Sequence, residues 1–385
     1  MIKKQNVYKN DIAILLSLAC ILTNLSQLPF FINLGKTQYL SVTIWLVIVI
    51  YICLFKRKIT ISRGSSHILI VFGILFFFMI LFQLLKGELY VNSTIFLGLM
   101  MSIYIYIVGD ICTDWINERN IKLILNSYCL STLYVSFAIF IEYFSNGLGL
   151  DSRVYVFESK NSFAQIAFVA AIIFLFMEYN KSKLGKVLQF LIVVFLCFFI
   201  MILRSRATIL GLAICLMSFA VMKTSNKKVK LIVWICGITF VILLITNENF
   251  NNIIFNQILF SGRDLNNIDD LSSGRLTIIE SFPMKLNGEW LTGIGNIYFE
   301  CFPLSAILNY GIIIGIIFIV VSYYPLMFAL KNKRKSKYHE MFFFIALGFI
   351  VNSFFEGLAP LGPGAKCYIL WLLFGILQKK GAIYE

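Results

Sequence analysis

Arginine occurs at three places in this sequence where its side chain is suited to hold an anion. Arg204 and Arg206 lie in the segment LRSRA between two apolar blocks, and Arg275 lies in SSGRLTIIESF within a long polar stretch. The planar guanidinium matches phosphate oxygens in a two-pronged contact. Ionisable groups at membrane depth are costly and usually have a task, so the pair in LRSRA favours phosphate binding. Snorkelling of both side chains to lipid headgroups is the alternative.

Arg275 follows two serines, Ser272 and Ser273, either of which is a plausible N-cap. The sequence therefore predicts a helix that begins just before Arg275 and that Pro283 ends or kinks. A cation in the first turn opposes the helix dipole unless an anion binds there as well. Free N–H groups and the guanidinium would then face the same anion. An ordinary surface arginine is the alternative.

Carboxylates are the candidates for proton transfer. Glu300 comes just before an apolar block, so it is expected near a membrane surface, where it could act as a general base. A solvated loop carboxylate is the alternative. Glu142 and Glu356 lie at the ends of apolar blocks and could line a cavity, and Arg153 is a further candidate for substrate binding.

The elements that must position these side chains are membrane-spanning helices. The chain has 385 residues, of which 59% are hydrophobic and 14% charged, and its mean hydropathy is +0.86. The apolar blocks have the length that crosses a bilayer as helix. We expect an all-α polytopic bundle of about twelve spans, at 11–31, 38–55, 67–85, 94–114, 121–144, 162–179, 187–203, 207–222, 230–246, 303–329, 340–358 and 363–378.

Lysine and arginine set the predicted orientation. With both termini in the cytoplasm, 23 of the 33 basic residues fall on the inner side, as the positive-inside rule requires. Because the basic residues form short clusters between the spans, the net charge of +14 does not indicate nucleic-acid binding. Residues 1–385 then form a single membrane domain with two larger external loops, 145–161 and 247–302. A turn at about 204–206 on the outer face keeps this charge bias.

Two of the predicted spans have alternatives. The first could be a signal peptide, but it is long and has no A-x-A-like cleavage site, so we interpret it as a retained helix. The last span is weak, because its densest part, CYILWLLFGIL, is short. A re-entrant or short tilted helix is the alternative there. The nine cysteines show no metal-binding spacing, and neither a disulfide framework nor a zinc site is inferred.

Three motifs resemble the O-antigen polymerase and O-antigen ligase-like membrane proteins. RSRATILGLAI resembles the opening of one of their helices, SSGRLTIIESFPMKLNGEWLTGIGN resembles their large external loop, and FPLSAILNYGIIIG resembles the helix that follows it. Together the motifs cover about 204–316. The order and spacing of the three motifs, together with the position of the large loop, carry the resemblance.

The resemblance implies a C-type glycosyltransferase fold in the bacterial inner membrane that acts on undecaprenyl-diphosphate-linked oligosaccharides. Arg206 and Arg275 match the arginines thought to hold the diphosphate, with Arg204 beside them. Glu300 would be the base, and Gly293 and Gly295 would let the backbone approach the glycan. A chain-length regulator protein is a further implied partner, and no cofactor is expected.

The resemblance leaves alternatives to a polymerase of O-antigen, capsule or exopolysaccharide units. Ligases of the family carry a histidine where this chain reads Phe299-Glu300-Cys301, which favours the polymerase. The first outer loop has no acidic residue, so a metal-dependent mechanism is not expected. A flippase for the same lipid-linked units is the other alternative. Such transporters often consist of two related halves, which this sequence does not display.

Overall fold

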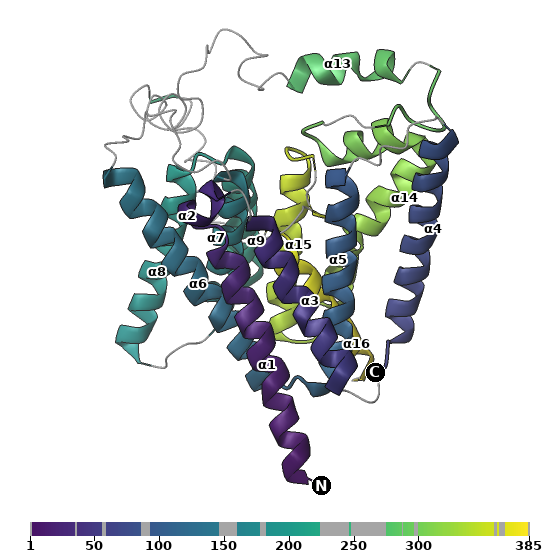
Figure 1. The fold of residues 1–385 in the computed structure, drawn as a ribbon. Coiled ribbons are helices and arrows are strands. Elements are labelled where there is room, and N and C mark those ends of the chain that lie inside the picture. The colour runs from purple at the N-terminus through teal and green to yellow at the C-terminus, as the bar shows by residue number, and fades with distance from the viewer. Residues whose placement is uncertain are drawn as a thin grey trace.

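The chain forms a bundle of α-helices (Figure 1). The computed structural model describes residues 2–34, 37–55, 59–85, 93–145, 160–177, 182–223, 246–247, 275–286, 288–295, 299–357, 360–361 and 366–383. Within these ranges there are thirteen α-helices, one short 3-10 helix and no strand. The helices are α1 (Ile2–Leu25), α2 (Pro29–Asn33), α3 (Thr37–Phe55), α4 (Arg63–Leu85), α5 (Ser93–Cys112), η1 (Thr113–Trp115), α6 (Glu118–Ser145), α7 (Lys160–Phe176), α8 (Lys183–Ile202), α9 (Arg206–Lys223), α13 (Arg275–Lys285), α14 (Phe302–Asn332), α15 (Lys337–Ser353) and α16 (Tyr368–Ile383).

Four of these helices are long and apolar enough to cross a membrane. They are Arg63–Phe82, Glu118–Ser145, Lys183–Ile202 and Phe302–Asn332. Eleven of the twelve ranges predicted as spans are occupied by helix, and the remaining range, 230–246, lies almost wholly outside the described residues. The all-α prediction is therefore confirmed for the described part of the chain, whereas a count of twelve spans stays a prediction.

The helix at the first predicted span ends earlier than expected. The sequence predicted one helix over 11–31, but α1 ends at Leu25 and α2 begins at Pro29. Leu28 is extended, with φ −64° and ψ 139°, because a residue before proline avoids the helical region. Proline also removes one backbone donor from the helix. The prediction of an unbroken helix was wrong at this proline.

The weakly apolar last span is the centre of the bundle. α16 is 16 residues long, or about 24 Å at the α-helical rise. Ile369, Trp371 and Phe374 are all essentially inaccessible. α5 approaches α16 closely through Gly109 and Gly375, since a Cβ added to Gly375 would lie 2.3 Å from the Tyr106 carbonyl oxygen. α16 is thus surrounded by other helices, and its short length is compatible with that position.

α14 is not one straight helix, as the predicted span 303–329 required. Gly311 has φ 76° and ψ 174°, which divides α14 into 302–310 and 312–332. The ring centroids of Phe302 and Tyr323 lie 6.1 Å apart, whereas a straight helix would separate these residues by about 31 Å. The segment 302–310 therefore folds back onto the start of 312–332. We call the bend at Gly311 the elbow.

Residues 288–295, which we call the brace, are bonded to the elbow. The N–H of Ile294 donates to the Leu308 carbonyl at 2.6 Å, and the N–H of Ile312 donates to the Trp290 carbonyl at 2.9 Å. A Cβ on Gly293 would lie 2.4 Å from the Gly311 nitrogen, so the two backbones touch. The brace is thereby fixed on both sides of the bend.

The described part of the loop that was predicted to be external has, together with 302–310, its own small core. Leu286, Phe299 and Leu308 are buried together, and partly buried apolar side chains from α13, the brace and 302–310 pack around them. α13 contains Pro283 and continues to Lys285, so this proline neither ends the helix at its own position nor starts a loop. In Figure 1, α13 lies beyond one end of the bundle, opposite the end where α1 begins and α16 ends.

Polar side chains tie the helices together at the end that carries both termini. Asp110 is fully buried and accepts from the Ser62 N–H at 3.0 Å and the Ser65 hydroxyl at 2.8 Å. Asp114 pairs with Lys379 of α16 at 2.8 Å. These contacts link the end of α5 to the start of α4 and to α16. They give partners to Asp110 and Lys379, which the bundle buries.

His339 makes this end of the bundle sensitive to acid. Burial and, to a smaller degree, the charge of Lys335 lower the pKa of the His339 imidazole below its ordinary value. The unfolded chain then binds more protons than the folded chain below about pH 6.5, so stability is complete above that pH and falls below it.

We expect the thermal midpoint in detergent to decrease as the pH is lowered from about 7.5 to about 5.5. His339→Gln should make that decrease smaller. His67→Gln is the control, since His67 is the only other histidine and is exposed. An equal fall in wild type and His339→Gln would contradict the prediction.

Candidate functional site

Arg204 and Arg206 lie in the sharp turn that joins α8 to α9. α8 ends at Ile202 and α9 begins at Arg206, so the predicted turn at 204–206 is present. Arg204 has φ 53° and is buried, with 8% of its surface exposed. A left-handed conformation is uncommon for a bulky residue and costs on the order of 1 kcal/mol, which the surrounding contacts must offset. Such strain is concentrated at functional sites, so the turn is the first candidate.

A buried hydrogen-bond chain fixes this turn against α15. The hydroxyls of Ser205 and Thr208 lie 3.0 Å apart, and the Thr208 hydroxyl donates to the Asn352 side-chain oxygen at 3.3 Å. The Asn352 amide in turn donates to the Gly348 carbonyl at 3.0 Å. Thr208 and Asn352 are fully buried. A satisfied buried network of this kind holds the turn in a single geometry.

The same end of α15 contacts α14 and the segment before α16. The hydroxyls of Ser353 and Tyr323 lie 2.6 Å apart. Glu356 pairs with Lys366 at 3.2 Å, and these two side chains are 12% and 8% exposed. Asn352, Ser353 and Glu356 therefore connect α9, α14 and the start of α16 within five residues of one another. We call this group, with Arg204, Ser205 and Thr208, the polar band.

The polar band lies at the end of the bundle away from both termini. α9 begins there and α15 ends there, while Lys379 and Asp114 lie at the other end, beside the last turn of α16. The elbow, the brace and α13 are also at the end away from the termini (Figure 1). The elbow, the brace and α13 are thus at the same end of the bundle as the polar band.

The structure places the remaining predicted site residues on the external loop. Arg275 is the first residue of α13, as the predicted helix start required. Gly293 and Gly295 have positive φ values of 70° and 74°. Glu300 is half-buried and comes two residues before α14. Arg153 and the proposed N-cap serines lie outside the described residues.

These residues form two groups rather than one cluster. Arg204 and Arg206 share a turn of the bundle, whereas Gly293, Gly295 and Glu300 belong to the loop unit with α13. Gly293 already has a structural role, because its lack of a Cβ lets the brace approach the elbow closely. A role of these glycines toward a glycan stays a prediction.

Sequence reasoning missed four members of the polar band, Ser205, Thr208, Asn352 and Ser353, and also their neighbours Tyr323 and Lys366. The signal was present in the segment VNSFFEG, where two polar residues and an acid follow an apolar run. Polar side chains inside an apolar block must find partners, so their spacing marks a helix end that faces other helices rather than lipid. Lys366 could not be paired with Glu356 without the turn between them.

The chemistry that the turn could support is the binding of an anion by the guanidinium groups of Arg204 and Arg206. A guanidinium and preorganised amides stabilise developing negative charge in a site from which water is excluded. Among the described residues, no three His, Cys, Asp or Glu side chains are grouped as metal ligands. None of the eight cysteines that the structure describes forms a disulfide.

Comparison with known proteins adds no relative to this description. No protein-family model matches the chain, and no curated protein sequence matches it.

Proposed function

We propose that this protein is a polymerase of undecaprenyl-diphosphate-linked oligosaccharide repeat units, located in a bacterial inner membrane with both termini in the cytoplasm. The observation that carries the proposal is the strained, buried Arg204 in one turn with Arg206, at the end of the bundle where α13, the brace and the elbow lie. Arginine at the outer end of membrane helices suits a diphosphate at the level of the lipid headgroups.

The proposed reaction joins two lipid-linked chains. A sugar hydroxyl of the acceptor unit attacks the anomeric carbon of the donor chain, and the bond from that carbon to the diphosphate oxygen breaks. Undecaprenyl diphosphate leaves with the bonding electron pair. Arg206 and Arg275 would stabilise the charge that develops on the diphosphate, as electrostatic preorganisation does in other transfer reactions.

The hydroxyl proton needs an acceptor in this scheme. Glu300 is the candidate base, because it comes just before the elbow helix 302–310 and is half-buried at the outer end. A carboxylate within hydrogen-bond reach of the attacking hydroxyl would take its proton. Glu356 is held by Lys366 at 3.2 Å, so we assign it to the framework instead.

The resemblance of the three motifs to O-antigen polymerases supports the same assignment. The order of the turn, the loop helix and the elbow helix along the chain follows the order of those motifs. Ligase activity toward a second lipid-linked acceptor and flipping of single units are the alternatives that the experiment must separate.

The test is polymer formation in a strain that lacks its own polymerase. We expect a ladder of polysaccharide from wild type and single repeat units from Arg206→Ala or Arg275→Ala. The rate should fall by about a hundredfold or more, because each arginine would act on the charge of the leaving group. Lysine at either position should rescue little, since it lacks the two-pronged geometry.

Arg334→Ala, at an exposed arginine of the end that carries the termini, is the control at matched membrane abundance. Full ladders from both arginine variants would contradict the proposal. Repeat units that never reach the outer face would instead favour a flippase.

A further inference from the structure

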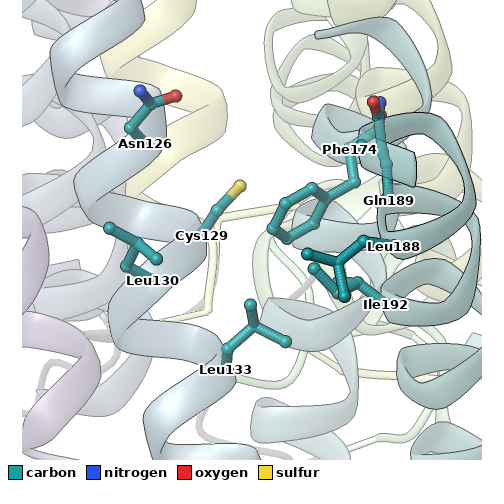
Figure 2. Close-up of a pocket in the computed structure, with 9 residues that line it drawn as sticks. Asn126, Cys129, Leu130, Leu133, Phe174, Leu188, Gln189 and Ile192 are labelled. Carbon is teal, nitrogen blue, oxygen red and sulfur yellow. The ribbon is translucent and has the colours of Figure 1, made fainter. Parts of the chain in front are cut away.

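Two grooves adjoin each other along α6 near the end that carries both termini. The first has a volume of about 440 Å³ and lies between α1 and the start of α6. The second has a volume of about 330 Å³ and lies between α6, α7 and α8 (Figure 2). Asn126 lines both of them. The two grooves therefore form one elongated depression that crosses from a polar to an apolar region.

One face of α6 runs along the whole depression. Arg119, Leu123 and Asn126 line the first groove, and Leu130 and Leu133 continue into the second. Their spacing of three to four residues places them on one side of the helix. Leu130 is 66% exposed. On a helix that crosses a membrane, such a leucine faces lipid chains.

The first groove is positively charged. Arg119 and Lys122 line it, and no acidic residue is among the residues that line either groove. Glu118 precedes Arg119 but is not among the residues that line the groove. The groove therefore complements an anion.

The second groove is apolar along its length. Figure 2 shows Leu130 and Leu133 of α6 facing Leu188 and Ile192 of α8 across the depression. Gln189 is its polar residue besides Asn126, and the Gln189 amide donates to two carbonyls at the end of α7, that of Met177 at 2.6 Å and that of Phe174. Those bonds use its donors to cap α7, so the groove suits a hydrocarbon chain.

Asn126 marks the junction with a buried acceptor. Its side-chain oxygen is inaccessible and has no hydrogen-bond partner among the described residues. The amide side chain of Asn126 thus lies where the charged groove meets the apolar one.

We propose that this depression binds one anionic glycerophospholipid, of the phosphatidylglycerol type. The phosphate lies against Arg119 and Lys122, and one acyl chain lies between α6 and α8. Basic pockets between helices on the cytoplasmic side bind lipid headgroups in this way. The site is far from the polar band, so it does not depend on the proposed polymerase activity.

The test is lipid binding by the purified full chain, measured by native mass spectrometry during titration with phosphatidylglycerol or phosphatidylcholine of equal chain length. We expect phosphatidylglycerol to bind more tightly by about tenfold or more, from roughly two basic contacts. The pair Arg119→Gln with Lys122→Gln should remove that preference. Leu133→Trp should block long-chain phosphatidylglycerol and spare a short-chain form.

The control removes the same charge elsewhere at the same end, with Lys331→Gln and Arg334→Gln, both exposed residues of α14 and the turn after it. The control pair should retain the preference. Equal binding of both lipids by wild type would overturn the proposal, as would an equal loss in the control pair.

Discussion

Gly311→Ala should destabilise the folded protein by about 3 kcal/mol or more and detach the brace from the elbow. A Cβ at this position would lie 2.0 Å from the Leu291 carbonyl oxygen, which is backbone and cannot rotate away. The conformation itself, with φ 76° and ψ 174°, is one that only glycine adopts readily. The clash of the added Cβ and the strain of the backbone both destabilise the folded protein.

Two measurements check the Gly311 prediction. The thermal midpoint in detergent should fall, and hydrogen exchange at the amides of Ile294 and Ile312 should become fast, because both donate across the elbow. Gly288→Ala is the matched control. Gly288 also has a positive φ, 83°, but an added Cβ would meet nothing within 4 Å.

The Gly288→Ala control separates the backbone strain of a positive φ from the steric clash of an added Cβ. Gly288→Ala should therefore cost about 1 kcal/mol, the conformational part alone. Equal destabilisation by the two variants, with the brace amides still protected in Gly311→Ala, would show that the elbow is not held by this backbone contact.

Lys366→Met should destabilise the protein by about 3–5 kcal/mol, because it leaves the Glu356 carboxylate buried without its partner. The two side chains are 8% and 12% exposed and lie 3.2 Å apart. Replacement of both residues, with Lys366→Met and Glu356→Met, should recover most of the loss, since a buried ion pair and an apolar pair are often of similar stability.

Thermal unfolding of wild type, the two single variants and the double variant measures the coupling energy between Lys366 and Glu356. Lys331→Met is the control, at an exposed lysine of α14, and should leave the midpoint unchanged. A single Lys366→Met variant as stable as wild type, or a double variant as unstable as the single one, would argue against a buried pair at the end of α15.

The two variants also inform the proposed function. The elbow supports the segment that carries Glu300, and the pair supports the end of α15 that holds Asn352. We expect residual folded Gly311→Ala protein to lose polymer formation through the loop, while its lipid binding at α6 is retained. Retained polymer formation would place the chemistry away from the external loop.

The sequence by itself determined that the chain is an all-α bundle and where nearly all of its described helices lie. Long apolar blocks can satisfy their backbone only as helices in lipid, so block boundaries and helix boundaries nearly coincide. The turn between α8 and α9 also followed from the sequence, through the distribution of lysine and arginine. The helix start at Arg275 followed from local capping residues.

Only the tertiary structure decided how these elements meet. The predicted span at 303–329 is bent at Gly311, and the brace some twenty residues earlier fixes the bend. The sequence did not predict the bend, because a glycine in an apolar run does not indicate its own backbone angles. The fully buried position of α16 depends on α5, and the pairing of Asn352 with Thr208 depends on the contact between α15 and α9. Local sequence patterns indicate which side chains avoid water. The contacts named here join residues far apart in the chain, so their geometry is set only when the helices pack together.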